Sequence, residues 1–346
     1  MKTIHVGVSG INAVDNPGPG IGVARSLKED RDLNVKIIGL AYDAMEPGIY
    51  MDWVVDRSCM MPYPSGGGEA VLERLLDIKQ KHGLDYVIPN LDSELPFYIK
   101  YADRLRENGI ETFLPNLSQF RLRGKDKLPA LAAEIGIQLP KTKVITSPTM
   151  LHEAIDAVGM PVMVKGCFYQ AFRCFTKPEA SARFNELVAE WGYPVILQEV
   201  VAGDELNVVG LGDGAGNCLG LVGIKKMWVT AQGKMWTGVT VKNKPMLDAA
   251  ERFVRQSRWR GPFELECMAA GDDVYLIEIN PRFPAWVYLA TGVGVNLPSR
   301  LLRSSLGLPI DGATDYPAGK LFVRYSYDLV TDMTAFQNML MRGENP

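Results

Sequence analysis

The sequence predicts an α/β protein in which a Rossmann-like parallel-sheet N-terminal domain precedes a two-part α+β region. Short apolar runs alternate with amphipathic helical patterns over the first third of the chain, which indicates parallel strands covered by helices. After about Pro115, glycine-punctuated runs rich in Val, Leu and Trp predict antiparallel strands instead. The 346 residues also exceed what one hydrophobic core usually supports, so several packed units are expected.

In the first region, strands are expected at residues 4–8, 35–40, 86–89 and 110–114, with helices near 23–27, 70–78 and 95–105. Parallel sheets bind their ligands beyond the carboxyl ends of the strands. This rule places residues 9–20, Asp43 and residues 90–92 on the functional rim.

The rest of the chain divides into two further units. We expect helices at 128–135, 178–191 and 245–258, strands at 160–165 and 194–200, several strands between 206 and 240, and a hairpin at 262–280. The predicted domains are residues 1–117, 118–200 and 201–346.

Composition excludes several classes of protein. A formal charge of −3, from 37 basic and 40 acidic residues, argues against a nucleic-acid-binding protein. No apolar stretch approaches the ~20 residues of a membrane span, and the first residues enter a strand pattern without a signal peptide. Five scattered cysteines without a CxxC pair fit a reduced, cytoplasmic protein. Three histidines form no local zinc-ligand set, so chemistry is expected on carboxylates, lysines and arginines.

The predicted last hairpin gathers acidic residues on one face. Side chains alternate along a strand, so Glu278 and Asn280 share a face, and Glu264 and Glu266 share one on the preceding strand. With a turn at residues 271–273 and Ala270 opposite Val274, Glu266 faces Glu278 and Glu264 faces Asn280. Oxygen ligands without histidine suit Mg²⁺ or Mn²⁺. An exposed sheet face with ordinary surface glutamates is the alternative, although the surrounding strand is apolar.

Two other segments carry polar groups at strand ends. Lys165 ends the apolar run 160–165, where a phosphate would balance its charge; a lysine reaching from a strand end to solvent is an equally good interpretation. The apolar run 196–201 leads into a glycine turn and Glu205, which could bind a purine edge and a ribose hydroxyl. Taken alone, that segment is better explained as a strand and a solvated turn.

Together these segments resemble the ATP-grasp superfamily, in its carbamoyl-phosphate-synthase-like branch, where a Rossmann-like domain precedes a two-subdomain α+β ATP-grasp fold. The matching segments are Gly124–Lys127 with residues 133–140, Met160–Lys165, Gln198–Val201, Glu278–Arg282 and, in the N-terminal domain, Val87–Leu95.

The resemblance implies a role for each matching residue. Lys127 and Lys165 would bind the nucleotide phosphates, with Lys165 at the α-phosphate and adenine side, and Arg282 would bind the transferred phosphate. Arg282 and Lys165 would be the catalytic residues. The adenine hinge would comprise Gln198, Glu199, Val200 and Val201, with Glu205 on the ribose. The metal would be held by Glu278, Asn280 and Glu266, with Glu264 as the alternative to Glu266.

The implied activity is an ATP-dependent ligase that activates a carboxylate as an acyl phosphate and couples it to an amine. Its cofactors would be ATP and Mg²⁺ or Mn²⁺, its substrates amino acids or peptides, and a homodimer is possible. Candidate acceptor-site residues are Asn16, Asp92, Glu94, Arg300, Arg303 and Arg324.

Two alternatives remain open. The segment 166–173 after Lys165 is aromatic and has a single glycine where the family has a glycine-rich loop, which would fit a degenerate nucleotide-binding regulator or peptide-binding module. Residues 18–22 with Asp43 could indicate a nicotinamide dehydrogenase, but their glycine spacing is not GxGxxG.

Overall fold

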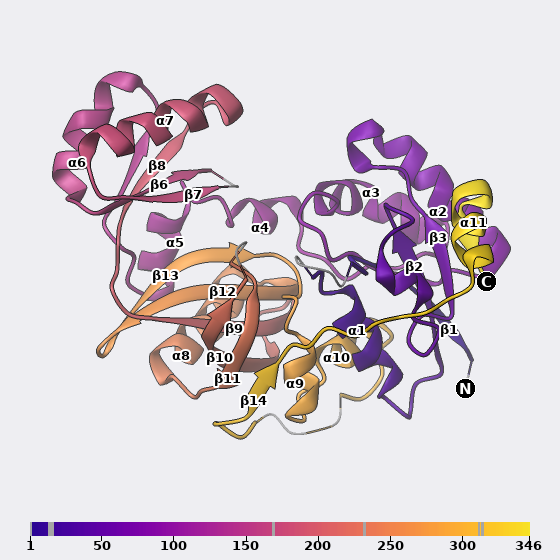
Figure 1. The fold of residues 1–346 in the computed structure, drawn as a ribbon. Helices are drawn as coiled ribbons and strands as arrows, with labels where there is room; N and C mark the ends of the chain where they lie inside the picture. The colour runs from indigo at the N-terminus through magenta and orange to yellow at the C-terminus, as the bar shows by residue number, and fades with distance from the viewer. Residues whose placement is uncertain (1, 13–16, 168–169, 231–232, 311, 313–314) are drawn as a thin grey trace.

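Three β-sheets with helices packed against them build the chain, as the computed structural model shows (Figure 1). The structure describes residues 2–12, 17–167, 170–230, 233–310, 312 and 315–346. The mixture of a largely parallel sheet with two antiparallel sheets confirms the predicted fold class.

The N-terminal sheet has the strand order β15-β3-β2-β1-β4, in which β1 to β4 are parallel. Its strands are β1 (Ile4–Ser9), β2 (Val35–Ala41), β3 (Arg57–Met60), β4 (Tyr86–Ile88) and β15 (Glu344–Asn345). Its helices are α1 (Gly20–Lys28), α2 (Gly68–His82) and α3 (Leu95–Glu107), with short 3₁₀ turns at Pro47–Tyr50 and Pro64–Gly66. The strand predicted at residues 110–114 is absent: this segment makes only one bridge, from Glu111 to Tyr86.

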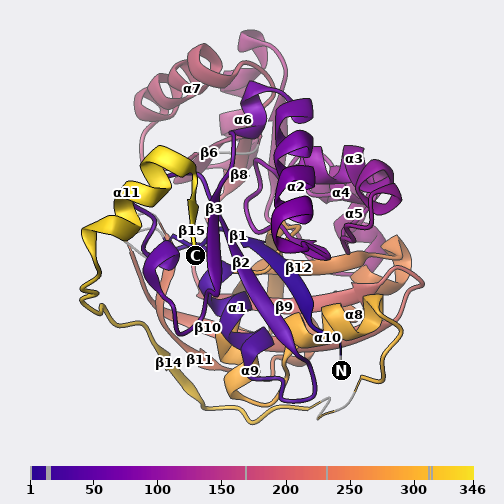
Figure 2. The ribbon, with the colours of Figure 1, turned by 90° about the vertical axis from the view of Figure 1, so that its right-hand side faces the viewer.

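The strand β15 comes from the other end of the sequence and pairs antiparallel with β3. Helix α11 (Met333–Arg342) leads into it, and both figures show α11 beside the N-terminal sheet (Figures 1 and 2). Met339 of α11 packs into the small core around Ile11 and Ala41. The hydrogen bonds of Glu344 with Arg74 (3.0 Å) and His82 (2.9 Å) add polar attachments. Part of the predicted C-terminal unit therefore completes the first sheet.

The second sheet is antiparallel, with the order β5-β8-β6-β7. Its strands are β5 (Thr142–Ile145), β6 (Val162–Gly166), β7 (Ala171–Cys174) and β8 (Val195–Glu199), and a 3₁₀ turn (Pro148–Met150), α6 (Leu151–Val158) and α7 (Lys177–Trp191) complete this unit. Apolar residues of both helices and of β6 and β8, among them Ile155, Phe184 and Leu197, form its own core.

The third and largest sheet has the order β13-β12-β9-β10-β11-β14. Its strands are β9 (Asp204–Asp213), β10 (Cys218–Val229), β11 (Met235–Thr240), β12 (Arg260–Ala270), β13 (Asp273–Asn280) and β14 (Leu321–Val323). The remaining helices are α4 (Leu117–Arg121), α5 (Leu128–Ile135), α8 (Lys244–Ser257), α9 (Tyr288–Gly292) and α10 (Leu297–Ser305).

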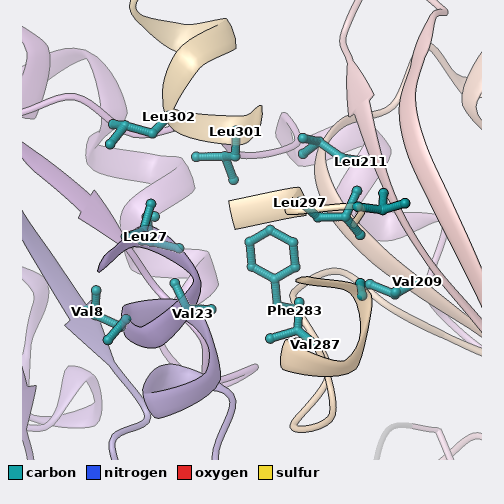
Figure 3. Close-up of a cluster of buried hydrophobic side chains, with 14 of the residues drawn as sticks. Val8, Val23, Leu27, Val209, Leu211, Phe283, Val287, Leu297, Leu301 and Leu302 are labelled. Atoms are coloured by element: carbon teal, nitrogen blue, oxygen red, sulfur yellow. The ribbon is translucent and has the colours of Figure 1, made fainter. Parts of the chain in front are cut away.

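A continuous apolar core joins the N-terminal sheet to the large sheet. Figure 3 shows Val23 and Leu27 of α1 facing a cluster that includes Leu301, Phe283 and Val209. Beside this core, Arg303 of α10 forms a two-pronged ion pair with Asp30, at 2.7 and 2.8 Å. This packing fixes the rim of the N-terminal sheet against the end of β13, where the polar residues gather.

Candidate active site

The hairpin β12–β13 brings the four predicted polar residues together in the predicted pairs. Glu266 faces Glu278, and Glu264 faces Asn280. The predicted turn is wrong, however, because Ala270 pairs with Asp273 and the turn is one residue shorter. A bulge between Glu266 and Cys267 absorbs the difference in register.

Glu264 is the most enclosed of these carboxylates, with 3% of its surface exposed. It accepts hydrogen bonds from Asn207 (2.7 Å), Asn280 (2.9 Å) and the indole of Trp286 (2.8 Å). Such donors make a buried carboxylate tolerable, since burying an unpaired charge is costly. Glu264 therefore orients both asparagines on the sheet face.

Lys226 balances the charge on this face. Its ammonium contacts Glu205 and lies 3.5 Å from Glu266. Burial alone would raise the pKa of Glu266, but Lys226, a hydrogen bond from Asn280 and the charge of Arg282 outweigh it and lower that pKa. Burial does raise the pKa of Glu278. Of the two facing glutamates, one is held ionised and the other retains its proton more tightly.

Two buried lysines approach the hairpin from other elements. Lys165, 6% exposed on β6, donates a 2.5 Å hydrogen bond to Gln198. Lys125, 7% exposed, lies 3.3 Å from Glu278. Burial, and then the neighbouring charge of Lys125, lower the pKa of Lys165 to about 8.

Lys127 lies apart from this group. Its side chain is 61% exposed and pairs with Asp126 at 2.9 Å. Lys127 is the N-terminal flanking residue of α5, whereas Lys125 precedes that helix and points to the acidic hairpin. The predicted segment is thus in place, but the lysine at the site is two residues earlier.

The predicted adenine hinge lies at the end of β8. Gln198 is 3% exposed and also donates to Thr142 (3.1 Å), while Glu199 accepts from the Lys141 amide at 3.1 Å. Val200 and Val201 follow the strand and are half-buried. The strands β6 and β7 leave residues 167–170 between them, of which 168 and 169 lie outside the described residues.

Arg282 links the acidic hairpin to a small cavity of about 90 Å³. Its guanidinium lies 3.7 Å from Glu264 on one side and donates to Asp92 at 3.2 Å on the other. The cavity is lined by residues 17–19, 90–92, Lys234, Arg282 and Ala285. The predicted functional rim at 90–92 therefore borders the cavity.

Glu94 is a buried carboxylate that holds the backbone of the 90–92 segment. It is 1% exposed and accepts hydrogen bonds from Tyr42 (2.7 Å) and from the backbone amides of Asn90 (2.7 Å) and Leu91 (2.9 Å), as well as from Ser9. Burial raises the pKa of Glu94. Glu94 thus fixes the shape of the 90–92 segment rather than lining the cavity.

The other acceptor-site candidates fall into different places. Arg303 pairs with Asp30, Arg300 donates to the Leu219 carbonyl (2.8 Å), and Arg324 donates to the Ala285 carbonyl (2.8 Å). Asn16 lies outside the described residues. Gly18, from the segment considered for a nicotinamide dehydrogenase, is required by close packing: a Cβ there would lie 2.2 Å from the Gly10 carbonyl oxygen.

A second group of possible metal ligands lies at the far end of the N-terminal sheet. Atoms of Cys59, His82 and Glu344 lie within 4.8 Å of one another. Burial raises the pKa of Cys59 to about 12, and Glu344 is already paired with Arg74 and Lys81. These contacts favour a polar attachment of β15 over a metal centre.

Comparison with known proteins agrees with this arrangement. Residues 193–327 match the protein family described as ATP-grasp in the biosynthetic pathway with Ter operon. This stretch contains the acidic hairpin and the strands that carry Asn207 and Lys226. Over these residues the chain is similar to ATP-grasp proteins.

Similar ATP-grasp proteins share the fold at low sequence identity. The carbamoyl phosphate synthase large chain of Clostridium acetobutylicum is 22% identical over 225 residues, 61% of this chain and 21% of that protein. Phosphoribosylamine–glycine ligase of Mycobacterium leprae is 26% identical over 174 residues, 44% of this chain and 40% of that protein. The chain thus spans less than half the length of these curated relatives.

Among solved structures, the biotin carboxylase domain dimer of Hydrogenobacter thermophilus 2-oxoglutarate carboxylase, in complex with MgADP, ADP and bicarbonate, is similar with a TM-score of 0.67. The two are 17% identical, and the match covers 88% of this chain and 70% of that one. The similarity establishes the ATP-grasp fold over most of the chain.

The candidate site includes four residues that the sequence interpretation missed. They are Lys125, Asn207, Lys226 and Lys234. Asn207 and Lys226 had a signal, because each is a polar residue inside an otherwise apolar strand. Lys125 lay inside the recognised segment, and Lys234 showed no comparable signal.

Replacement of Lys226 by methionine should destabilise the protein by about 3 kcal/mol in metal-free buffer, because Glu205 and Glu266 would lose their shared counter-charge. Urea unfolding measures this. Lys225→Met is the matched control: its pair with Asp204 is exposed, and its loss should cost about 0.5 kcal/mol or less. Equal effects of the two substitutions would contradict this electrostatic interpretation.

Proposed function

We propose that the chain is an ATP-dependent carboxylate–amine ligase. The observation that carries the proposal is the position of Arg282, which contacts both the acidic hairpin through Glu264 and the cavity through Asp92. A phosphate bound at the hairpin and a carboxylate bound in the cavity would both lie beside this one cation. Such an arrangement suits phosphoryl transfer, which needs positioning and charge neutralisation.

The hairpin fits a divalent cation. Asn207 is fully buried, and its Oδ1 has no hydrogen-bond donor among the described residues. Asn280 uses its amide nitrogen toward Glu264 and Glu266, which leaves its oxygen as the remaining polar atom. We assign the metal to Glu266, Glu278 and Asn280. Glu264 would orient Asn280 through the hydrogen bond between them. Bound Mg²⁺, or Mn²⁺ with the same ligand preference, would neutralise the nucleotide phosphates.

The remaining cations are assigned to the nucleotide. Lys125, in place of Lys127, and Lys165 would bind the phosphates. The hinge Gln198–Val201 would receive the adenine, and Glu205, beside Lys226, the ribose. This assignment rests on the burial of both lysines next to Glu278 and on the ATP-grasp fold.

In the proposed reaction, a carboxylate oxygen of the substrate attacks the γ-phosphorus of ATP, and the bond to the β-phosphate oxygen breaks to release ADP. An amine nitrogen then attacks the acyl phosphate, loses a proton and displaces phosphate. The carboxylate and amine belong to the amino acid or peptide class. A cytoplasmic location and a homodimer stay predictions; among the described residues, no helix is both long and apolar enough to cross a membrane.

Phosphate release from ATP and Mg²⁺ with a panel of acids and amines tests the function. Glu278→Gln should lower turnover by about 100-fold or more, because the facing carboxylates lose one metal ligand. Glu134→Gln, an exposed change on α5, should leave turnover unaltered. Full turnover in Glu278→Gln would contradict the proposal. Nucleotide binding without any substrate-dependent turnover would favour the nucleotide-binding module, for which the aromatic sequence with a single glycine after Lys165 is the supporting observation.

Lys125→Met should weaken binding of a fluorescent ATP analogue by tenfold or more, because a buried charge-assisted contact contributes ~1.5–3 kcal/mol. Lys127→Met removes an exposed lysine and should change the dissociation constant by no more than about twofold. Fluorescence anisotropy with Mg²⁺ measures both. The reverse ranking would return the phosphate-binding role to Lys127.

ATP affinity should fall as the pH rises above about 8. The pKa of Lys165 is about 8, so below this pH the ammonium is present in the free protein. Bound phosphate favours the ammonium and raises that pKa, so affinity is full below pH 8 and declines above it. Titration between about pH 7.5 and 9.5 measures this. Lys165→Arg, which stays charged, should flatten the profile; an unchanged slope would exclude Lys165 as its cause.

A further inference from the structure

The cavity beside Arg282 has an acidic, hydrogen-bond-accepting wall with unused capacity. Asn90 is 1% exposed, and its amide nitrogen donates to the carbonyls of Ser9 (3.1 Å) and Ile88 (2.9 Å), which fixes the orientation of its Oδ1. Both this oxygen and Oδ1 of Asp92 are buried and have no hydrogen-bond donor among the described residues. The Asp92 side chain is 24% exposed and lines the cavity, so its carboxylate can accept a hydrogen bond from a ligand N–H.

The facing wall is cationic. Arg282 lies 3.2 Å from Asp92, and Lys234 also lines the cavity. Burial, together with the nearby Arg282, lowers the pKa of Lys234. In the part of the chain that the structure describes, no carboxylate lies within 4.0 Å of the Lys234 ammonium. Arg282 already has Asp92 and Glu264 as partners, so an anionic group on the ligand would chiefly offset the cost of burying Lys234.

The size of the cavity limits the ligand. Its volume of about 90 Å³ is well below the ~300–1,000 Å³ of pockets that hold drug-sized ligands. Pro17, Leu91 and Ala285 supply apolar surface beside the charged walls. A side chain of one or two non-hydrogen atoms would fit there, whereas a peptide chain would not.

We propose that this cavity binds a free α-amino acid with a small side chain, and that its carboxylate is the group that the protein activates. The ammonium donates to the Asp92 carboxylate, which Asn90 adjoins, and the carboxylate lies against Arg282 and Lys234. In an α-amino acid both charged groups are attached to one carbon, which matches the 3.2 Å separation of Asp92 and Arg282. The inference rests on the proposed ligase function and names the substrate class of that site.

Hydroxylamine serves as a general trapping nucleophile, so the natural amine need not be known. A carboxylate oxygen of the amino acid bonds to the γ-phosphorus of ATP as ADP leaves. The hydroxylamine nitrogen then bonds to the acyl carbon, phosphate leaves, and a proton is lost to water. The product is an amino-acid hydroxamate, which forms a coloured ferric complex.

The experiment incubates the full chain with ATP, Mg²⁺, hydroxylamine and one acid at a time. Glycine and alanine should give hydroxamate. Propionate, which lacks the amine, and N-acetylalanine, in which the amine is blocked, should give at least tenfold less. Alanylalanine and phenylalanine, which exceed the cavity, should also give at least tenfold less.

Variants test the two walls. Asp92→Asn should lower kcat/KM for alanine by tenfold or more, and Lys234→Met should raise the KM for alanine, while both retain wild-type affinity for the ATP analogue. Asp103→Asn is the matched control, since Asp103 is exposed on α3 and does not line the cavity. Its kinetics should equal those of the wild type.

The outcomes separate the two proposals. Equal or faster reaction with propionate, N-acetylalanine, alanylalanine or phenylalanine would overturn the amino-acid inference and leave the ligase function standing. Wild-type kinetics in Asp92→Asn would also overturn the inference. No hydroxamate from any of these acids, with phosphate release in the wider acid panel, would refute the inference alone. Absence of both signals would refute the ligase function, and the inference with it.

Discussion

The buried carboxylate of Glu264 is the contact on which the arrangement of the site depends. It holds donors from three places in the chain: Asn207 on β9, Asn280 on β13 and Trp286 beyond that strand. A charge enclosed to this degree is stable only if its donors stay in place, so the carboxylate and its partners order one another. Through Arg282 the same network reaches Asp92 on the rim of the N-terminal sheet. The N-terminal sheet and the large sheet are thereby joined by polar contacts at the place where they meet.

The site is also neutralised by its own side chains. Lys125 pairs with Glu278, Lys226 lies between Glu205 and Glu266, and Arg282 pairs with Asp92. A divalent cation entering the hairpin would compete with these lysines for the carboxylates, and nucleotide phosphates would accept the released ammonium groups. Metal and nucleotide are therefore expected to bind cooperatively. The metal would take the carboxylates from the lysines, and the nucleotide phosphates would take the lysine ammonium groups.

The sequence predicted those features that follow from local periodicity. Period-two alternation placed Glu264 and Glu266 opposite the right partners, although the turn was wrong; the pairing survived because a bulge beside Glu266 compensates for one residue. Periodicity could not choose between Lys125 and Lys127, because that choice depends on where α5 begins and on which lysine is buried. The return of β15 to the first sheet had no local signal, since a two-residue strand carries almost no pattern. The cavity depends on contact between distant segments, so the sequence indicated only parts of its rim, within residues 9–20 and at 90–92.

The strand β15 has a consequence for the order of folding. Glu344 pairs with Cys59, so the edge of the first sheet is closed by residues that leave the ribosome long after β1 to β4. Until then, β3 presents unpaired backbone groups along an open edge, which is a template for wrong pairing between chains. A contact of such long sequence separation is also slow to form. Until β15 docks, the N-terminal sheet therefore keeps an exposed edge at β3, which the pairing of Glu344 with Cys59 removes.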